Sequence, residues 1–321
     1  MKQKTALVIA TPTAVNGSVS GASLRVATIR HLLEEAGCET TIVSSAESGN
    51  HLEQSWDVVA LVSFSTAIRA TAARKKCKLL WLDCTDSWKL SRLSMARHGS
   101  IGEALKYLRD WLVLSRTPKL DLITFISDRD RRAEHRWLAR RGPAFVIPNC
   151  LPKERVNKSD TVRLVFVGPG NYGPNIRALK FLEHVLDRLP ANIFIDVFGD
   201  NPKGKSHSRL RFHGYTDSHA LYSEQDIHLV PITSGAGIKN KSAIPLSLGL
   251  RVIATSEGAN GLAQNENLFI ENDPNGFAAR ILQLITKSPA GRCTGSIFEV
   301  DETINFWTAW NQASDKFQPR G

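Results

Sequence analysis

The stretch Gly235-Ala-Gly-Ile-Lys-Asn-Lys241 is followed by a largely apolar run at 246–255 and then by Glu257-Gly-Ala-Asn-Gly-Leu262. The small residues let a ligand approach the main chain closely, and the two lysines lie two positions apart. The apolar run has the character of a buried strand, and it ends in a glycine-rich turn. Backbone N–H groups and ammonium groups together favour an anion such as a diphosphate. The stretch therefore predicts an α/β domain with an anion site at the end of its strands.

The same domain extends toward both ends of the chain as alternating strands and helices, which indicates a parallel sheet. A tight loop, Gly168-Pro-Gly-Asn-Tyr-Gly173, joins one strand to one helix, and its Gly168, Gly170 and Asn171 are candidates to hold a phosphate. A glycine-rich turn of this kind also occurs without a ligand. Strands are expected at 163–167, 193–198, 210–212, 227–230 and 251–254, and helices at 174–189, 277–285 and 303–317.

The first half of the chain shows a second alternating pattern. Strands are expected at 5–10, 40–43, 56–64, 79–82, 120–126 and 144–147, with one helix at 26–36. A basic amphipathic helix is expected at 100–116; it could face the domain core or rest on anionic lipid. The fold class is thus α/β, with two Rossmann-like domains. The expected boundaries are 1–152, a linker at 153–161, a second domain at 162–300, and a C-terminal helix at 301–321 that returns to the first domain.

Composition narrows the function classes. The chain has 321 residues and a net charge of +10, and most of the basic excess lies in the first half. This charge fits an anionic acceptor or an anionic membrane surface. The basic residues are not interleaved with aromatic residues, as they would be in a nucleic-acid-binding module. The five cysteines lack C-x-x-C spacing, and the histidines lack the spacing of a metal site. No apolar run is long enough to span a membrane. We expect a cytoplasmic protein that binds no metal.

A set of short motifs follows in order along the second half. They are Gly168 with Tyr172-Gly-Pro-Asn175, Phe198-Gly-Asp200, Phe212-His-Gly214, Asp226-Ile-His-Leu-Val-Pro231, Gly235 to Lys241, and Gly258-x-x-Gly261-Leu262. Ile126-Ser-Asp128 and Ile147-Pro-Asn149 belong to the same set in the first half. As an ordered set they resemble the retaining glycosyltransferases of the GT-B fold (glycosyl transferases group 1, family 4-like). These enzymes assemble bacterial surface glycans and some natural products, and they place two Rossmann-like domains on either side of a cleft.

The resemblance implies a division of labour between the two domains. The second would bind a nucleotide-diphosphate sugar and the first a hydroxyl acceptor. Lys241, and with it Lys239, would offset charge that grows on the leaving diphosphate. The remaining donor-side candidates are Gly235, Ala236, Gly237, Glu257 and Gly258. Such enzymes work without a metal or other cofactor.

Candidates on the acceptor side come from the first half. Gly21 and Arg25 follow a loop rich in small residues, and Arg25 could reach the cleft or lie on the helix surface. Asp83 and Asp86 follow a strand and could orient an acceptor hydroxyl or move a proton. An Asx turn or a helix cap explains the two aspartates equally well.

One position departs from the family pattern. The glutamate that holds the donor's ribose usually lies three residues after the lysine, where this chain has Ile244 followed by Pro245. Isoleucine cannot accept hydrogen bonds from ribose, and the proline is expected to delay or kink the following helix. Glu257 could substitute for the missing carboxylate. The chain is therefore expected to be a cytoplasmic or membrane-peripheral glycosyltransferase of cell-surface glycan or natural-product biosynthesis. The alternative is a degenerate, non-catalytic partner of an active transferase.

Overall fold

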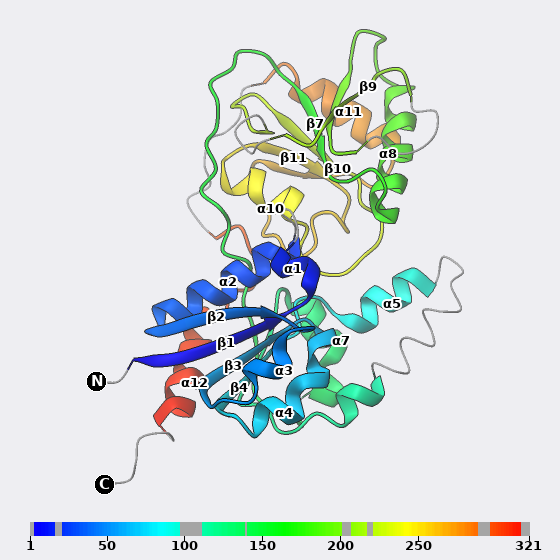
Figure 1. Cartoon of the computed structure of the whole chain (residues 1–321). Coiled ribbons are helices and arrows are strands. Elements are labelled where there is room, and N and C mark those ends of the chain that lie inside the picture. Colours follow the sequence, from blue (N-terminus) through cyan, green and yellow to red (C-terminus); the bar gives the residue numbers. More distant parts are fainter. Residues whose placement is uncertain are drawn as a thin grey trace. The chain divides into compact units, whose positions relative to one another are not determined.

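The computed structural model describes residues 3–16, 21–96, 111–138, 140–200, 207–216, 221–287 and 296–315. The chain divides into two compact units, each built on one six-stranded sheet (Figure 1). The first unit comprises Met1–Cys150 and Val300–Gly321, and the second comprises Leu151–Glu299. All strand pairings within the two sheets are parallel, with helices between the strands, so the predicted α/β class with two Rossmann-like domains is confirmed.

The first unit has the strand order β2-β1-β3-β4-β5-β6. Its strands are β1 (Lys4–Ala10), β2 (Cys38–Ser44), β3 (Trp56–Val62), β4 (Cys77–Asp83), β5 (Leu122–Phe125) and β6 (Ala144–Val146). Its helices are α1 (Pro12–Asn16), α2 (Gly21–Glu35), α3 (Ser48–His51), the 3₁₀ helix η1 (Phe64–Arg69), α4 (Ala70–Arg74), α5 (Trp88–Ala96), α7 (Asp128–Leu138) and α12 (Thr303–Asp315). Of the expected helix at 100–116, residues 100–110 lie outside the described part, and residues 111–115 are helical.

Alternation along the strands divides the core of the first unit into two layers. In β1, Leu7 and Ile9 belong to one buried cluster, whereas Ala6 and Val8 belong to the cluster on the other face of the sheet. The second cluster also takes up residues from α2 and from α12. The C-terminal helix therefore packs on the sheet of the first unit, with the Phe306 and Trp81 rings 5.0 Å apart.

The second unit has the strand order β12-β11-β10-β7-β8-β9. Its strands are β7 (Leu164–Val167), β8 (Ile195–Phe198), β9 (Leu210–Gly214), β10 (Ile227–Val230), β11 (Arg251–Ala254) and β12 (Leu268–Ile270). Its helices include α8 (Gly173–Leu186), α10 (Asn240–Ser247) and α11 (Pro274–Leu284), and the Phe181 and Phe277 rings join α8 to α11. After β7 the chain adds β8 and β9 on one side of β7, and β10 then pairs with β7 on its other side. The strand order consequently reverses between β7 and β10.

The expected delay of the helix by Pro245 is wrong, whereas a kink at Pro245 stays a prediction. Helix α10 begins at Asn240 and continues through Pro245 to Ser247. The proline removes one N–H donor from the helix, but Ser242, Ala243 and Leu246 of the same helix are buried. Their burial stabilises the helix despite the missing donor, so Lys241 lies in its first turn.

In the described part of the chain, no helix has the length and apolar character that a membrane span would need.

Candidate functional site

The most suitable ligand position in the second unit is the edge where its strand order reverses. The carboxyl ends of β7 and β10 are neighbours there, and β11 follows on the far side of β10. Ligands of open parallel sheets bind outside the carboxyl ends of the strands at such a point. The loops that leave these strands carry all the donor-side residues predicted from the sequence (Gly168, Gly170, Asn171, Gly235, Ala236, Gly237, Lys239, Glu257 and Gly258), and Lys241 follows in α10.

Lys241 lies at the centre of this edge. Its Nζ donates a hydrogen bond of 2.6 Å to Asn175 Oδ1 of α8 and lies 4.7 Å from the centre of the Phe166 ring of β7. No described carboxylate forms an ion pair with it. Burial, reinforced by repulsion from Lys239, lowers the pKa of Lys241 to about 7. An anion that reached this ammonium group would supply the missing counter-charge.

Gly168 makes room for the lysine. Its φ is +147°, and a Cβ at this position would lie 2.7 Å from both Lys241 Nζ and Asn175 Nδ2. Gly199, at φ +149°, abuts it so closely that a Cβ there would lie 2.1 Å from the Gly168 carbonyl oxygen. In the same loop Gly170 is buried and Asn171 is exposed. The predicted phosphate loop thus serves at least one structural purpose, the close approach of the main chain to Lys241.

Lys239 and Glu257 come together from different loops. The Lys239 ammonium group donates to the Ala236 and Gly237 carbonyl oxygens at 3.0 and 2.9 Å, and it lies 3.2 Å from Glu257 Oε1. The lysine side chain also packs over Gly235. Its charge is therefore compensated, unlike that of Lys241.

Gly258 and Asn260 brace the same loops. A Cβ on Gly258 would lie 2.4 Å from the Val230 carbonyl oxygen, so glycine is needed for the loop to close onto the end of β10. Asn260 Nδ2 contacts the Gly237 carbonyl oxygen at 3.4 Å. These contacts fix the shape of the edge rather than supply a charge.

Arg177 is a third cationic residue of this region, and the sequence analysis missed it. Its Nη2 donates to Ser234 Oγ at 2.5 Å, which ties α8 to the loop after β10. Its Nε is buried and has no hydrogen-bond partner within the described residues. Its position in the sequence could have identified it. Arg177 lies in the first turns of the helix that follows the glycine-rich loop, and an arginine there is close to the same edge of the sheet.

Ile244 occupies an apolar environment. Its side chain packs against the cluster of Tyr222, Leu248 and Leu250, with Val156 and Leu221 alongside. A carboxylate at this position would have to enter that cluster. Ile244 therefore takes part in packing, and Glu257 pairs with Lys239.

In the first unit, Arg25 and Asp83 bind each other. Both are 0% exposed, and Arg25 Nη2 lies 2.6 Å from Asp83 Oδ1. Arg25 Nη1 also donates to the Ile147 carbonyl oxygen at 2.6 Å, while Asp83 accepts from Thr124 Oγ1 at 2.6 Å. Groups that are buried and bonded in this way favour a structural role over contact with an acceptor, so the predicted catalytic and acceptor-side roles gain no support from this geometry.

Asp86 and Gly21 lie near this buried pair in the sequence, but in more open positions. Asp86 is half-buried and follows Thr85, whose φ is +55°, in the turn after β4. Gly21 is exposed and opens α2. Their predicted roles stay predictions.

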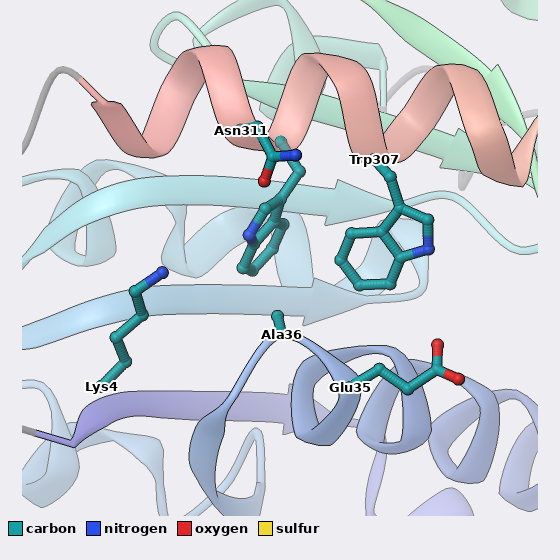
Figure 2. Close-up of a pocket in the computed structure, with 6 residues that line it drawn as sticks. Lys4, Glu35, Ala36, Trp307 and Asn311 are labelled. Carbon is teal, nitrogen blue, oxygen red and sulfur yellow. The ribbon is translucent and has the colours of Figure 1, made fainter.

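A hollow of about 390 Å³ lies elsewhere on the first unit. Figure 2 shows Trp307 and Asn311 on one helix above Ala36 and Glu35, with Lys4 at the side. Lys4 is the first residue of β1, so the hollow lies toward the amino end of that strand. None of the predicted site residues lines it. Nowhere in the described residues do three or more histidine, cysteine, aspartate or glutamate side chains form a group that could hold a metal.

Part of the chain matches a known protein family. Residues 137–287 match the family model described as glycosyl transferases group 1, just under half of the chain. The matched segment includes every donor-side residue discussed above. No curated protein matches the sequence.

Solved structures of similar fold cover nearly the whole chain. A glycosyltransferase from Rickettsia africae has 11% identity and a TM-score of 0.57, with 89% of each chain covered. A UDP-forming α,α-trehalose-phosphate synthase from Burkholderia xenovorans has 8% identity and a TM-score of 0.57, with 98% of each chain covered. S. aureus MnaA in complex with UDP has 14% identity and a TM-score of 0.52, with coverage of 97% of this chain and 98% of that chain. Likeness at this level shows the fold, and with the family match it supports a glycosyltransferase.

Proposed function

We propose that the protein transfers a sugar from a nucleoside-diphosphate donor to a hydroxyl acceptor with retention of configuration. The observation that carries the proposal is the buried, uncompensated ammonium group of Lys241 at the carboxyl edge of β7 and β10. Arg177 adds cationic charge at the same edge, where Lys239 is paired with Glu257. A diphosphate is the ligand group that such an edge suits best.

The chemistry proposed for this edge is a displacement on one face of the sugar. The bond between the anomeric carbon and the donor phosphate oxygen breaks, and the acceptor oxygen forms its bond from the same side. The acceptor proton passes to the departing phosphate oxygen. Lys241 would stabilise the negative charge that grows on the diphosphate as it leaves. No step requires a metal or another cofactor.

The acceptor and the cellular setting are proposed from charge alone. The basic excess of the first half favours an anionic or lipid-linked acceptor, or a position at the inner face of a membrane. Cell-surface glycan or natural-product biosynthesis would provide such an acceptor. UDP is the first nucleotide to test, because one of the similar structures is of a UDP-forming enzyme and another contains UDP.

The test is a thermal-shift panel with UDP, GDP, ADP, TDP and CMP, followed by the matching nucleotide sugars. A ligand present at a hundred times its dissociation constant adds about 2.7 kcal/mol of stability. Such a gain raises the unfolding midpoint by several degrees. Lys241→Met is expected to reduce the shift and to lower turnover at least tenfold, because it removes the charge and keeps the volume. A wild-type rate in this variant would refute the role given to Lys241.

Ile244 favours one alternative, a non-catalytic partner of an active transferase. Its packing against Tyr222, Leu248 and Leu250 leaves no carboxylate at the family's ribose position. Under this alternative no nucleotide shifts the midpoint, and the protein co-purifies with another transferase. A shift with one nucleotide, together with sugar transfer whose product keeps the donor's anomeric configuration by NMR, would exclude it.

A further inference from the structure

Asn175 makes two directed hydrogen bonds that together fix its orientation. Its side-chain oxygen accepts from Lys241 Nζ at 2.6 Å, and its side-chain nitrogen donates to the Pro169 carbonyl oxygen at 2.8 Å. The residue is 2% exposed and lies in the first turn of α8. The loop after β7 and the helix that follows it therefore hold the amide in one orientation, and the amide in turn holds the lysine.

The described surroundings of Lys241 contain other cations but no carboxylate that pairs with Lys241. Phe166 of β7 presents a ring face, and Asn175 of α8 presents a neutral amide. Lys239 precedes it in the chain, and Arg177 lies further along α8. Glu257, from the loop after β11, pairs with Lys239. Within the described residues, no carboxylate forms an ion pair with Lys241, and its close contacts are an amide, an aromatic ring and the Gly168 main chain.

We propose that Asn175 is the positioning residue of Lys241, and that its neutral amide leaves the counter-charge of the lysine to be supplied by a bound diphosphate. The inference rests on the proposed function for the identity of the ligand, but the placement of the lysine does not. An aspartate in the same position would neutralise the lysine within the protein. The amide instead orients the ammonium group and keeps its charge available to the ligand.

The arrangement has a measurable consequence, which is proton uptake on binding. Burial in the ligand-free protein lowers the pKa of Lys241 to about 7. At pH 8 the group is then about nine-tenths neutral. A diphosphate at this edge favours the charged form, so the lysine takes up a proton from solvent as the ligand binds. At pH 6 the lysine already carries its proton, and this contribution disappears.

The experiment is isothermal titration calorimetry of the full-length protein with UDP and with inorganic pyrophosphate, at pH 8 in buffers of different ionisation enthalpy. At pH 8 both ligands have lost most of the protons that they lose near neutral pH. We expect uptake of about 0.9 proton per nucleotide bound and a much smaller uptake when UDP binding is repeated near pH 6. Tight binding at pH 8 with no proton uptake would overturn the inference.

Variants separate positioning from general stabilisation. Asn175→Asp places a carboxylate against Lys241, so we expect the proton uptake to vanish and diphosphate affinity to fall at least tenfold. Lys241→Met is expected to abolish the uptake as well. The matched control is Lys180→Met, which removes an exposed lysine of α8. It is expected to leave the uptake unchanged.

A direct titration keeps the inference testable if no nucleotide binds. The ε-methylene NMR signal of Lys241 in the ligand-free protein should titrate near pH 7 and should move upward by at least 1 pH unit in Asn175→Asp. If Asn175→Asp does not fold, Asn175→Ala is titrated in its place, and an unchanged midpoint in that variant would overturn the positioning role. A wild-type midpoint near 10 would overturn the inference. If Lys241 titrates near pH 7 but no nucleotide binds, the proposed function is refuted and the positioning of Lys241 by Asn175 is not.

Discussion

The two units place buried charge in opposite ways at the carboxyl ends of their sheets. In the first unit, Arg25 and Asp83 neutralise each other, and both are fully buried. In the second unit, Lys241 is held by an amide and an aromatic ring and pairs with no carboxylate of the described residues. A buried charge that the protein compensates serves the fold, whereas one that it leaves uncompensated is a candidate for function. This difference separates two sets of residues that look equally functional in the sequence.

The largest expected effect concerns the compensated pair. Asp83→Asn keeps the shape of the side chain but leaves the buried Arg25 guanidinium without a counter-charge. Breaking a buried pair in this way is expected to destabilise the first unit by about 3–5 kcal/mol. All seven tryptophans lie outside residues 151–299, so urea unfolding followed by tryptophan fluorescence reports the first unit selectively.

Asp57→Asn provides the matched control for that measurement. Asp57 pairs with Lys78 at 2.6 Å, but the two side chains are 27% and 53% exposed. Exposed pairs contribute about 0–1 kcal/mol. Equal losses in the Asp83 and Asp57 variants would mean that burial does not distinguish the two pairs.

The uncompensated lysine is expected to give a smaller effect, and one that depends on pH. The pKa of Lys241 is about 7 in the folded protein, against an ordinary value near 10.4 in the unfolded chain. Between these values the unfolded state binds more protons, so the stability contributed by this group is present above pH 10 and is lost as pH falls through 7. We expect the free energy of unfolding of Lys241→Met, relative to that of wild type, to rise by about 1–3 kcal/mol from pH 10 to pH 6. This range allows for screening.

Hydrogen exchange of the β7 and β10 amides measures this difference in the second unit. Lys239→Met serves as the control, because its ammonium group is already paired with Glu257. Parallel stability curves for Lys241→Met and wild type from pH 6 to pH 10 would mean that Lys241 keeps an ordinary pKa.

The sequence predicted the sheets better than the sites, for a physical reason. Strands such as 79–82 and 144–147 are continuous apolar runs, and their period and length are local properties. The strand β12 (Leu268–Ile270) is apolar but only three residues long, so its pattern gives little signal. Contacts between distant residues depend on strand order instead, as with Arg25 and Asp83, which are 58 positions apart, and Asn175 and Lys241, which are 66 apart. Lysine, arginine and aspartate were therefore identified as candidates by residue type, but their partners could not be.

The smallest expected effect concerns the compensated lysine of the second unit. Glu257→Gln removes the charge that pairs with Lys239, and the two side chains are 17% and 12% exposed. The loss of stability is expected to stay near 1 kcal/mol, because the Ala236 and Gly237 carbonyl oxygens still accept hydrogen bonds from the ammonium group.

The same variant is expected to change ligand affinity. Pyrophosphate, measured by calorimetry, should bind Glu257→Gln up to about tenfold more tightly than wild type, since a negative charge has left the anion site. Glu271→Gln, which breaks a pair with Arg280 in the same unit, should leave that affinity unchanged. Weaker binding of UDP in Glu257→Gln would instead mean that Glu257 contacts the nucleotide, as expected of a substitute for the missing ribose carboxylate.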